Sequence, residues 1–115
     1  MTPSFNINCT VLKKEQVNLD DMKMTVNNNG VIIARCWQSC EHYVLITKID
    51  ENFVYIFDPY YLKENYYYND EDVSIVLHET FTHNRVVKIE RLFSCENKDF
   101  SLLKEADREV ILISR

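Results

Sequence analysis

Two residues that suit acid–base chemistry stand at the outer ends of two β-rich runs in the stretch RCWQSCEHYVLITKIDENFVYIFDPYY, residues 35–61. His42 begins the first run and Asp58 ends the second. An imidazole held by a carboxylate has its tautomer fixed and its protonated form stabilised, which a general base beside a nucleophile requires. The same two residues also suit a plain strand start and an Asp-Pro turn, so both interpretations stay open at this point.

The two runs have the sequence form of a β-hairpin, because only a very short polar link separates them. Alternate residues of a strand share a face, so the register of the hairpin decides whether the pair meets. With the turn centred at Asp50, Ile46 faces Val54 and His42 lies directly opposite Asp58. A two-residue loop would shift the pairing by one residue and destroy this arrangement.

The rest of the sequence predicts the elements that position this pair, within a single domain over residues 1–115. Leu19, Met22 and Val26 form the apolar face of a short helix that starts at Asn18. The apolar run GVIIARCW, residues 30–37, predicts a central strand buried on both faces. The other expected elements are an edge strand at 5–13, a tyrosine-rich loop at 60–72, a strand or short helix at 73–80, a strand at 85–93 and a closing strand at 107–114. Together they predict an α+β fold, with a small mostly antiparallel sheet and one or two helices, and a small mixed barrel fits the same pattern.

Charge and composition exclude several classes of protein. The net charge of −5 argues against a nucleic-acid partner, because nucleic-acid binding requires concentrated Lys and Arg. No signal peptide is recognisable and no apolar run approaches the roughly 20 residues of a membrane span, so we expect no membrane partner and a cytoplasmic location. The four cysteines show no dense spacing and are expected to be mostly free thiols.

The stretch GVIIARCW followed by HYVLITKIDENFVYIFDPYY resembles the C-terminal half of papain-like cysteine peptidases of the bacteriocin-processing, double-glycine-leader type. The resemblance covers about residues 19–61, and it implies a papain-like half-domain architecture. Carried over by position, it makes His42 the general base and Asp58 the residue that orients it. It also implies a peptide or protein substrate and no cofactor.

The nucleophile that this family requires is not found in the chain. The family places a cysteine at the N-terminus of a helix, six residues after a glutamine that stabilises the oxyanion, and neither Gln16 nor Gln38 has a cysteine six residues on. Cys9 precedes His42 as the family order requires, but it lies in a strand-like stretch. Cys40 lies in a loop two residues before His42. Both are weak candidates, and we expect the nucleophile to come from a preceding segment or a second chain.

Other interpretations of the same residues stay open. Cys36, Cys40 and His42 could supply three zinc ligands, but the Cys-x-x-Cys spacing and a fourth ligand are missing, so no metal is predicted. Cys36 is better interpreted as a small core residue, and His78 and His83 as solvated surface residues. The domain could also be a non-catalytic relative that binds a peptide or protein, or a small interaction domain whose resemblance is accidental.

Overall fold

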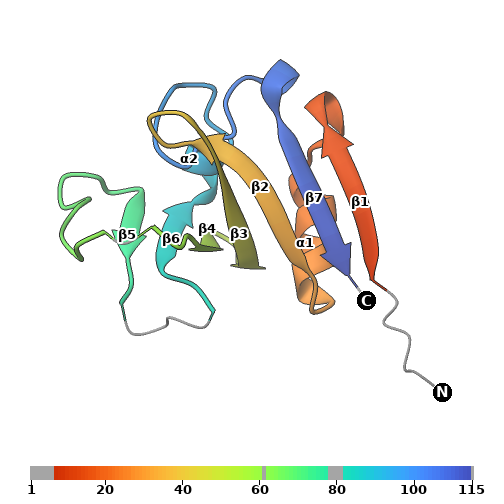
Figure 1. Cartoon of the computed structure of the whole chain (residues 1–115), viewed down its shortest axis with the longest axis horizontal. Coiled ribbons are helices and arrows are strands. Elements are labelled where there is room, and N and C mark those ends of the chain that lie inside the picture. The colour runs from red at the N-terminus through yellow and green to blue at the C-terminus, as the bar shows by residue number, and fades with distance from the viewer. Residues whose placement is uncertain (1–6, 61, 78–81, 115) are drawn as a thin grey trace.

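Seven strands form one sheet in the structure, a computed structural model that describes residues 7–60, 62–77 and 82–114 (Figure 1). The strands lie in the order β1-β7-β2-β3-β4-β6-β5, and every neighbouring pair is antiparallel. Their bounds are Asn8–Lys13 for β1, Val31–Trp37 for β2, Glu41–Ile49 for β3, Phe53–Phe57 for β4, Val73–Ile75 for β5, Arg85–Lys88 for β6 and Glu109–Ser114 for β7. The described residues also form the α-helices α1 (Leu19–Asn27) and α2 (Ile89–Leu92) and the 3-10 helices η1 (Lys14–Gln16) and η2 (Glu105–Asp107). The predicted α+β fold is confirmed, and the sheet is open rather than a barrel, since β1 and β5 lie at opposite ends of the strand order.

Helix α1 begins where the sequence predicts. The Asn18 side chain accepts a hydrogen bond from Asp21 N at 2.8 Å and so caps the first turn. At the other end, Asn29 has the left-handed φ of 64° that commonly closes a helix. Gly30 follows, and a Cβ atom there would lie 2.5 Å from Ile113 O, so the close approach of the helix end to β7 requires glycine.

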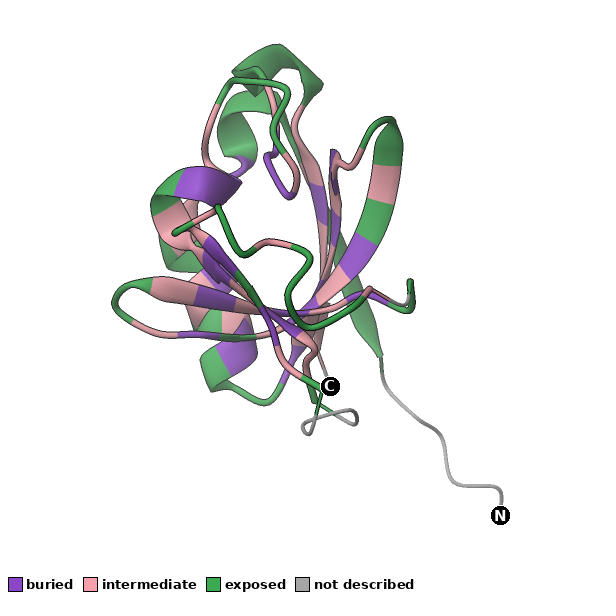
Figure 2. Ribbon diagram, turned by 90° about the vertical axis from the view of Figure 1, so that its left-hand side faces the viewer, coloured by how far each residue is buried: buried purple, intermediate pink, exposed green. Residues whose placement is uncertain are grey.

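The core lies on the inner face of the sheet, which is the face that packs against α1 and α2 (Figure 2). Met22 and Val26 of α1 are buried there, as their spacing predicts, with alternate residues of β2, namely Ile32, Ala34 and Cys36. The intervening β2 residues are only half-buried. The prediction that this strand is buried on both faces is therefore wrong, because both helices pack on the same side.

The outer face of the sheet explains why the sequence of β2 is apolar apart from Arg35. The cross-strand registers join Val11, Ile111, Ile33, Leu45 and Phe57 into one apolar row across five strands. Neighbours in such a row cover part of one another's surface, and all members except the exposed Val11 are half-buried in this way. A continuous apolar run thus predicts the strand correctly without revealing what covers each face.

The C-terminal third departs from the prediction at residues 85–93. The chain forms β6 and then turns into α2 at Ile89, whose N–H donates to Asn52 O at 3.0 Å. The turn brings Leu92 into the core, where it is fully buried. Strand β5 occupies the start of the predicted element at 73–80, of which residues 78–80 lie outside the described part, and β7 is the predicted closing strand. Within the described ranges no helix is long and apolar enough to cross a membrane.

Candidate active site

The β3–β4 hairpin carries the candidate pair in a register that differs from the predicted one. Ile46 lies opposite Ile56 rather than Val54, and nearer the turn Ile49 lies opposite Val54. A β-bulge that follows Ile46 joins these two parts of the ladder. The prediction that the two candidate residues are directly opposed is therefore wrong.

The side chain of Asp50 fixes the turn and thereby the register. Asp50 Oδ1 accepts hydrogen bonds from Asn52 N at 2.9 Å and from Phe53 N at 2.7 Å, while Asp50 N donates to Phe53 O at 3.0 Å. The hydroxyl of Tyr55 donates to Asp50 Oδ2 at 2.7 Å. The turn therefore starts at Asp50 instead of being centred on it, because an aspartate can bind the backbone two residues further on.

The bulge decides which face of the sheet His42 occupies. Ile46 and Ile49 are both buried although they are three residues apart, which is possible because the bulge adds one residue at Thr47. Alternation then continues from Ile46 through Val44 to His42 on the inner face. Regular alternation from Ile49 would instead turn His42 to the outer face. The observed register differs from the predicted one by two residues, and a shift of two leaves every side chain on its face.

His42 and Asp58 meet diagonally across the hairpin. When the Ile46–Ile56 pairing is continued by two residues on each strand, Val44 lies level with Asp58. His42, two residues further along β3, is the next side chain on the same face. Diagonal neighbours of this kind are within reach of long side chains, and His42 Nε2 lies 3.1 Å from Asp58 Oδ1. Because a carboxylate can only accept, Nε2 of a neutral imidazole donates this bond and Nδ1 carries the lone pair.

The two partners differ in their exposure to water. Asp58 is fully buried, whereas 25% of the His42 side chain is exposed. Tyr60 N donates a second hydrogen bond to Asp58 Oδ1 at 3.0 Å, and Asp58 Oδ2 has no partner among the described residues. The imidazole can therefore meet a substrate while its carboxylate partner stays protected from solvent.

Two residues that contact the Asp58 segment are absent from the sequence predictions. Asn84 binds the backbone of Asp58, and the buried Arg85 donates to Tyr60 O at 2.5 Å. They lie 26 and 25 residues away from these partners in the sequence. The only hint in the local sequence is the spacing of Arg85 and Val87. Residues two apart in a strand share a face, so a strand that buries Val87 also buries the charge of Arg85.

A cleft of about 270 Å³ opens beside His42. Its walls come from the bend between β2 and β3 and from the tyrosine-rich loop that follows β4, and they comprise Gln38, Ser39, Cys40, His42, Tyr60, Leu62 and Tyr66. The tyrosine-rich loop therefore borders the cleft. No Lys, Arg, Asp or Glu lines the cleft among the described residues, so it suits an uncharged, partly aromatic or aliphatic segment.

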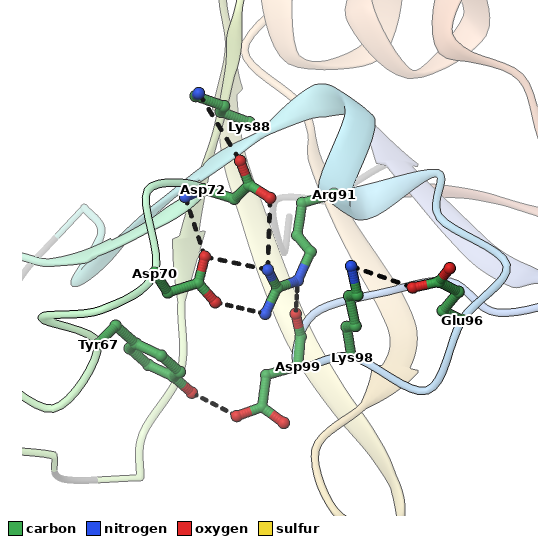
Figure 3. A network of polar contacts seen from close by, with 8 residues as sticks. All are labelled: Tyr67, Asp70, Asp72, Lys88, Arg91, Glu96, Lys98 and Asp99. Carbon is green, nitrogen blue, oxygen red and sulfur yellow. Dashed lines mark hydrogen bonds and ion pairs between the residues drawn. The ribbon is translucent and has the colours of Figure 1, made fainter.

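Arg91 of α2 fastens the tyrosine-rich loop to the body of the domain (Figure 3). Its guanidinium binds Asp70 at 2.6 and 3.0 Å and Asp72 at 3.4 Å, and its Nε donates to Asp99 O at 2.9 Å. The hydroxyl of Tyr67 donates to Asp99 Oδ2 at 2.8 Å. Burial and then this bond raise the pKa of Tyr67 above its usual value. These contacts, here called the Arg91 network, hold the loop that supplies one wall of the cleft.

Cys36 lies directly opposite His42 on the neighbouring strand, but it is not a reactive thiol. It is 1% exposed, as expected for a core residue. Burial, with the negative charges of Asp58 and Asp99 adding to it, raises the pKa of Cys36 to about 12. The side chain therefore stays a neutral thiol at physiological pH.

The structure brings only one of the two weak nucleophile candidates to the cleft. Cys40 is exposed and lines the cleft with His42. Cys9 and Val31 both pair with Ile113 of β7, so Cys9 lies level with Val31. Val31 is five residues from Cys36 along β2, a distance of about 17 Å at about 3.3 Å per residue. Cys9 also lies on the outer face, because Val31 does.

The zinc site and the expected solvation of His83 find no support in the part of the chain that is described. No group of three His, Cys, Asp or Glu side chains there could hold a metal ion. His83, expected to be solvated, is half-buried and packs edge-on against Tyr55 with ring centroids 5.0 Å apart. His78 lies outside the described residues.

Comparison with known proteins finds a matching family. The model of a family described as the Peptidase C39 family matches residues 1–90. The match is wider than the resemblance at residues 19–61 and includes both members of the candidate pair. No curated protein and no solved structure matches the chain.

Proposed function

The chain belongs to the Peptidase C39 family, and from that premise we propose that it is a cysteine peptidase-type domain in which His42 is the general base and Asp58 orients it. The observation that carries the proposal is the 3.1 Å contact from His42 Nε2 to the buried Asp58 Oδ1 at the wall of a cleft. This contact leaves His42 Nδ1 as the nitrogen that accepts a proton.

The reaction proposed is the hydrolysis or transfer of a peptide acyl group through a thioester. Nδ1 of His42 takes the proton of a thiol, and the thiolate sulfur attacks the amide carbonyl carbon. The C–N bond then breaks, and the imidazolium returns the proton to the leaving amine. Water or another nucleophile finally attacks the thioester and releases the free thiol. Asp58 stabilises the imidazolium that forms between these steps.

We place the nucleophile on a second chain or a preceding segment, with Cys40 as the candidate within this chain. The support is that none of the described cysteines lies at a helix N-terminus, the position that lowers a thiol pKa through the backbone N–H groups. Cys40 has the right location in the cleft but lies in a bend.

Peptide cleavage by single variants tests the general base. The test uses the chain together with the segment or second chain that supplies the thiol, with unfolded casein as the probe and mass spectrometry of new termini as the readout. We expect His42→Ala to lower turnover at least about 100-fold, because general-base catalysis typically contributes this much. His83→Ala is the matched control, since it removes an imidazole outside the cleft, and it should leave turnover unchanged. Equal turnover in wild type and His42→Ala would rule out the proposed role.

A second candidate function, binding of a peptide or protein without cleavage, is favoured by the inert Cys36 and by the aromatic walls of the cleft. Alkylation rates separate the two functions. If, with the proposed nucleophile-supplying segment or chain present, no cysteine reacts with iodoacetamide faster than free cysteine at neutral pH and the casein peptides bind without being cut, the binding function holds. A single hyper-reactive cysteine supports the peptidase instead.

A further inference from the structure

We infer that Asn84 and Arg85 are positioning residues that hold Asp58 where it can accept the hydrogen bond of His42. The inference rests on the proposed function, because it concerns the same pair. Both residues lie at the start of β6, on the side of β4 away from the His42 strand. Strands β3 and β6 flank β4, so these two residues contact the Asp58 segment from one side while His42 contacts it from the other.

The side chain of Asn84 acts as one more peptide group of the β4–β6 ladder. The last backbone pair of that ladder joins Ile56 to Arg85, so Asp58 lies beyond it. At Asp58 the Asn84 carboxamide replaces the backbone partner that a longer β6 would supply. Asp58 N donates to Asn84 Oδ1 at 2.8 Å, and Asn84 Nδ2 donates to Asp58 O at 2.6 Å. Asn84 itself is fixed, because its N–H donates to Ile56 O and its carbonyl accepts from Val76 N, both at 2.9 Å.

This two-point contact determines the backbone orientation at Asp58. Both backbone groups of a buried residue need hydrogen-bond partners, and Asn84 supplies both at once. Without the carboxamide, the peptide groups around Asp58 would have to turn toward other partners. The carboxylate would then move away from His42 Nε2.

Arg85 fixes the next part of the same segment and supplies positive charge beside it. Its side chain is only 1% exposed, and its Nη2 donates to Tyr60 O while Nη1 donates to Asn84 O at 3.1 Å. Tyr60 N also donates to Asp58 Oδ1, so Arg85 fixes the position of Tyr60, which in turn binds the Asp58 carboxylate.

The charges of Arg85 and Asp58 depend on each other. Burial lowers the pKa of Arg85, and the negative charge of Asp58 opposes that shift. A guanidinium stays protonated in proteins, and a buried charge without a counter-charge is strongly destabilising. Arg85 Nε and Asp58 Oδ2 are the two buried side-chain atoms without partners in the described part of the chain, one on each member of this charge pair.

The exchange-protected Nε2 proton of His42 provides the test, and the test requires no turnover. A proton donated to a buried carboxylate exchanges slowly with water and gives a separate low-field proton NMR signal, which His42→Ala assigns. We expect the signal in wild type and its loss in Asp58→Asn, in Asn84→Ala and in Arg85→Met. Arg85→Lys keeps the charge and should retain the signal at reduced intensity.

The matched control is Arg108→Met, which removes a half-buried arginine that donates to the backbone carbonyls of Leu103 and Phe93 rather than to the Asp58 segment. It should leave the His42 signal in place, whereas general loosening of the fold would weaken the signal in both arginine variants. Where circular dichroism shows Arg85→Met to be unfolded, Asn84→Ala decides. A signal that is unchanged in Asn84→Ala and lost in Asp58→Asn overturns the positioning role but leaves the pair intact. A signal that is missing in wild type or unchanged in Asp58→Asn overturns the pair and this inference with it.

Discussion

At the scale of the residue, neighbours on one sheet face acquire opposite properties from their surroundings. Cys36 and His42 are directly opposed on adjacent strands, yet the thiol is buried while part of the imidazole faces the cleft. The same Asp58 that binds the imidazole adds its negative charge to the burial that suppresses ionisation of the thiol. Proximity to a candidate base therefore does not by itself make a cysteine a nucleophile.

The raised pKa of Cys36 predicts a loss of stability at alkaline pH. The thiol has an ordinary pKa of 9.0 and a folded-state pKa of about 12, so its contribution to stability is fully present below pH 9 and is lost as the pH rises toward 12. Between pH 8 and 10.5 the unfolded state releases the proton and the folded state does not. The free energy of unfolding should fall by about 2 kcal/mol more in wild type than in Cys36→Ala over this range.

Urea unfolding at the two pH values measures this difference. Cys40→Ala is the matched control, because it removes an exposed thiol and should keep the pH dependence of wild type. Parallel pH profiles for wild type and Cys36→Ala would contradict the predicted suppression of the thiolate.

At the scale of the element, the β3–β4 hairpin shows how one turn residue sets the geometry of a distant pair. Asp50 organises the turn through two backbone N–H groups and the Tyr55 hydroxyl. The bulge at Thr47 then returns the strand to the phase in which His42 faces inward. The pair depends on both features, because an odd shift in register would separate its members.

Removal of the Asp50 carboxylate should weaken the hairpin. We expect Asp50→Ala to lower the free energy of unfolding by about 1–2 kcal/mol, since it deletes several partly exposed hydrogen bonds. The Tyr55 hydroxyl, followed by the N–H of Asn52, lowers the pKa of Asp50. The stabilisation is thus present above the unfolded value near 3.8 and is lost as the pH falls through the lower folded value.

Urea unfolding at pH 7 and pH 3 checks both parts of this prediction. Glu51→Ala alters the exposed neighbour in the same turn and should change stability by less than about 0.5 kcal/mol. If the two variants are equally stable at pH 7, the turn is not fixed by the Asp50 side chain.

At the scale of the whole molecule, the Arg91 network joins segments that are far apart in sequence. It connects α2, the segment that carries Asp99 and the tyrosine-rich loop, and through the loop it defines a wall of the cleft (Figure 3). Burial raises the pKa of Asp70, but the hydrogen bonds from Arg91 and from Asp72 N, with the positive charges of Arg91 and Lys98, together outweigh it and leave that pKa below its ordinary value. The carboxylate is thus the form that the network favours.

Replacement of Arg91 by methionine should release the loop. We expect Arg91→Met to lower the free energy of unfolding by about 2 kcal/mol, because two aspartates lose a partly buried partner. Limited proteolysis should then cut the loop at its tyrosines faster than in wild type. Lys98→Met, which removes a more exposed ion pair with Glu96, is the control and should leave the cleavage rate unchanged. Equal cleavage of the loop in Arg91→Met and wild type would contradict the role of the network.

Local patterns in the sequence determine the elements and the faces of their residues. Helix α1, the hairpin and the closing strand follow from spacing, capping and turn residues. The shared face of His42 and Asp58 also follows, because the predicted register differs from the observed one by two residues and side chains alternate with a period of two. Their contact was therefore predictable although their direct opposition was wrong.

Tertiary structure alone decides the register, the burial of each sheet face and the partners of Asp58. The turn at Asp50 and the bulge depend on hydrogen bonds that residue periodicity does not contain. Asn84 and Arg85 reach the site only because β6 pairs with β4, a contact between segments separated by a long loop. Sequence patterns report on neighbours along the chain, whereas the position of the carboxylate depends on residues brought together by folding.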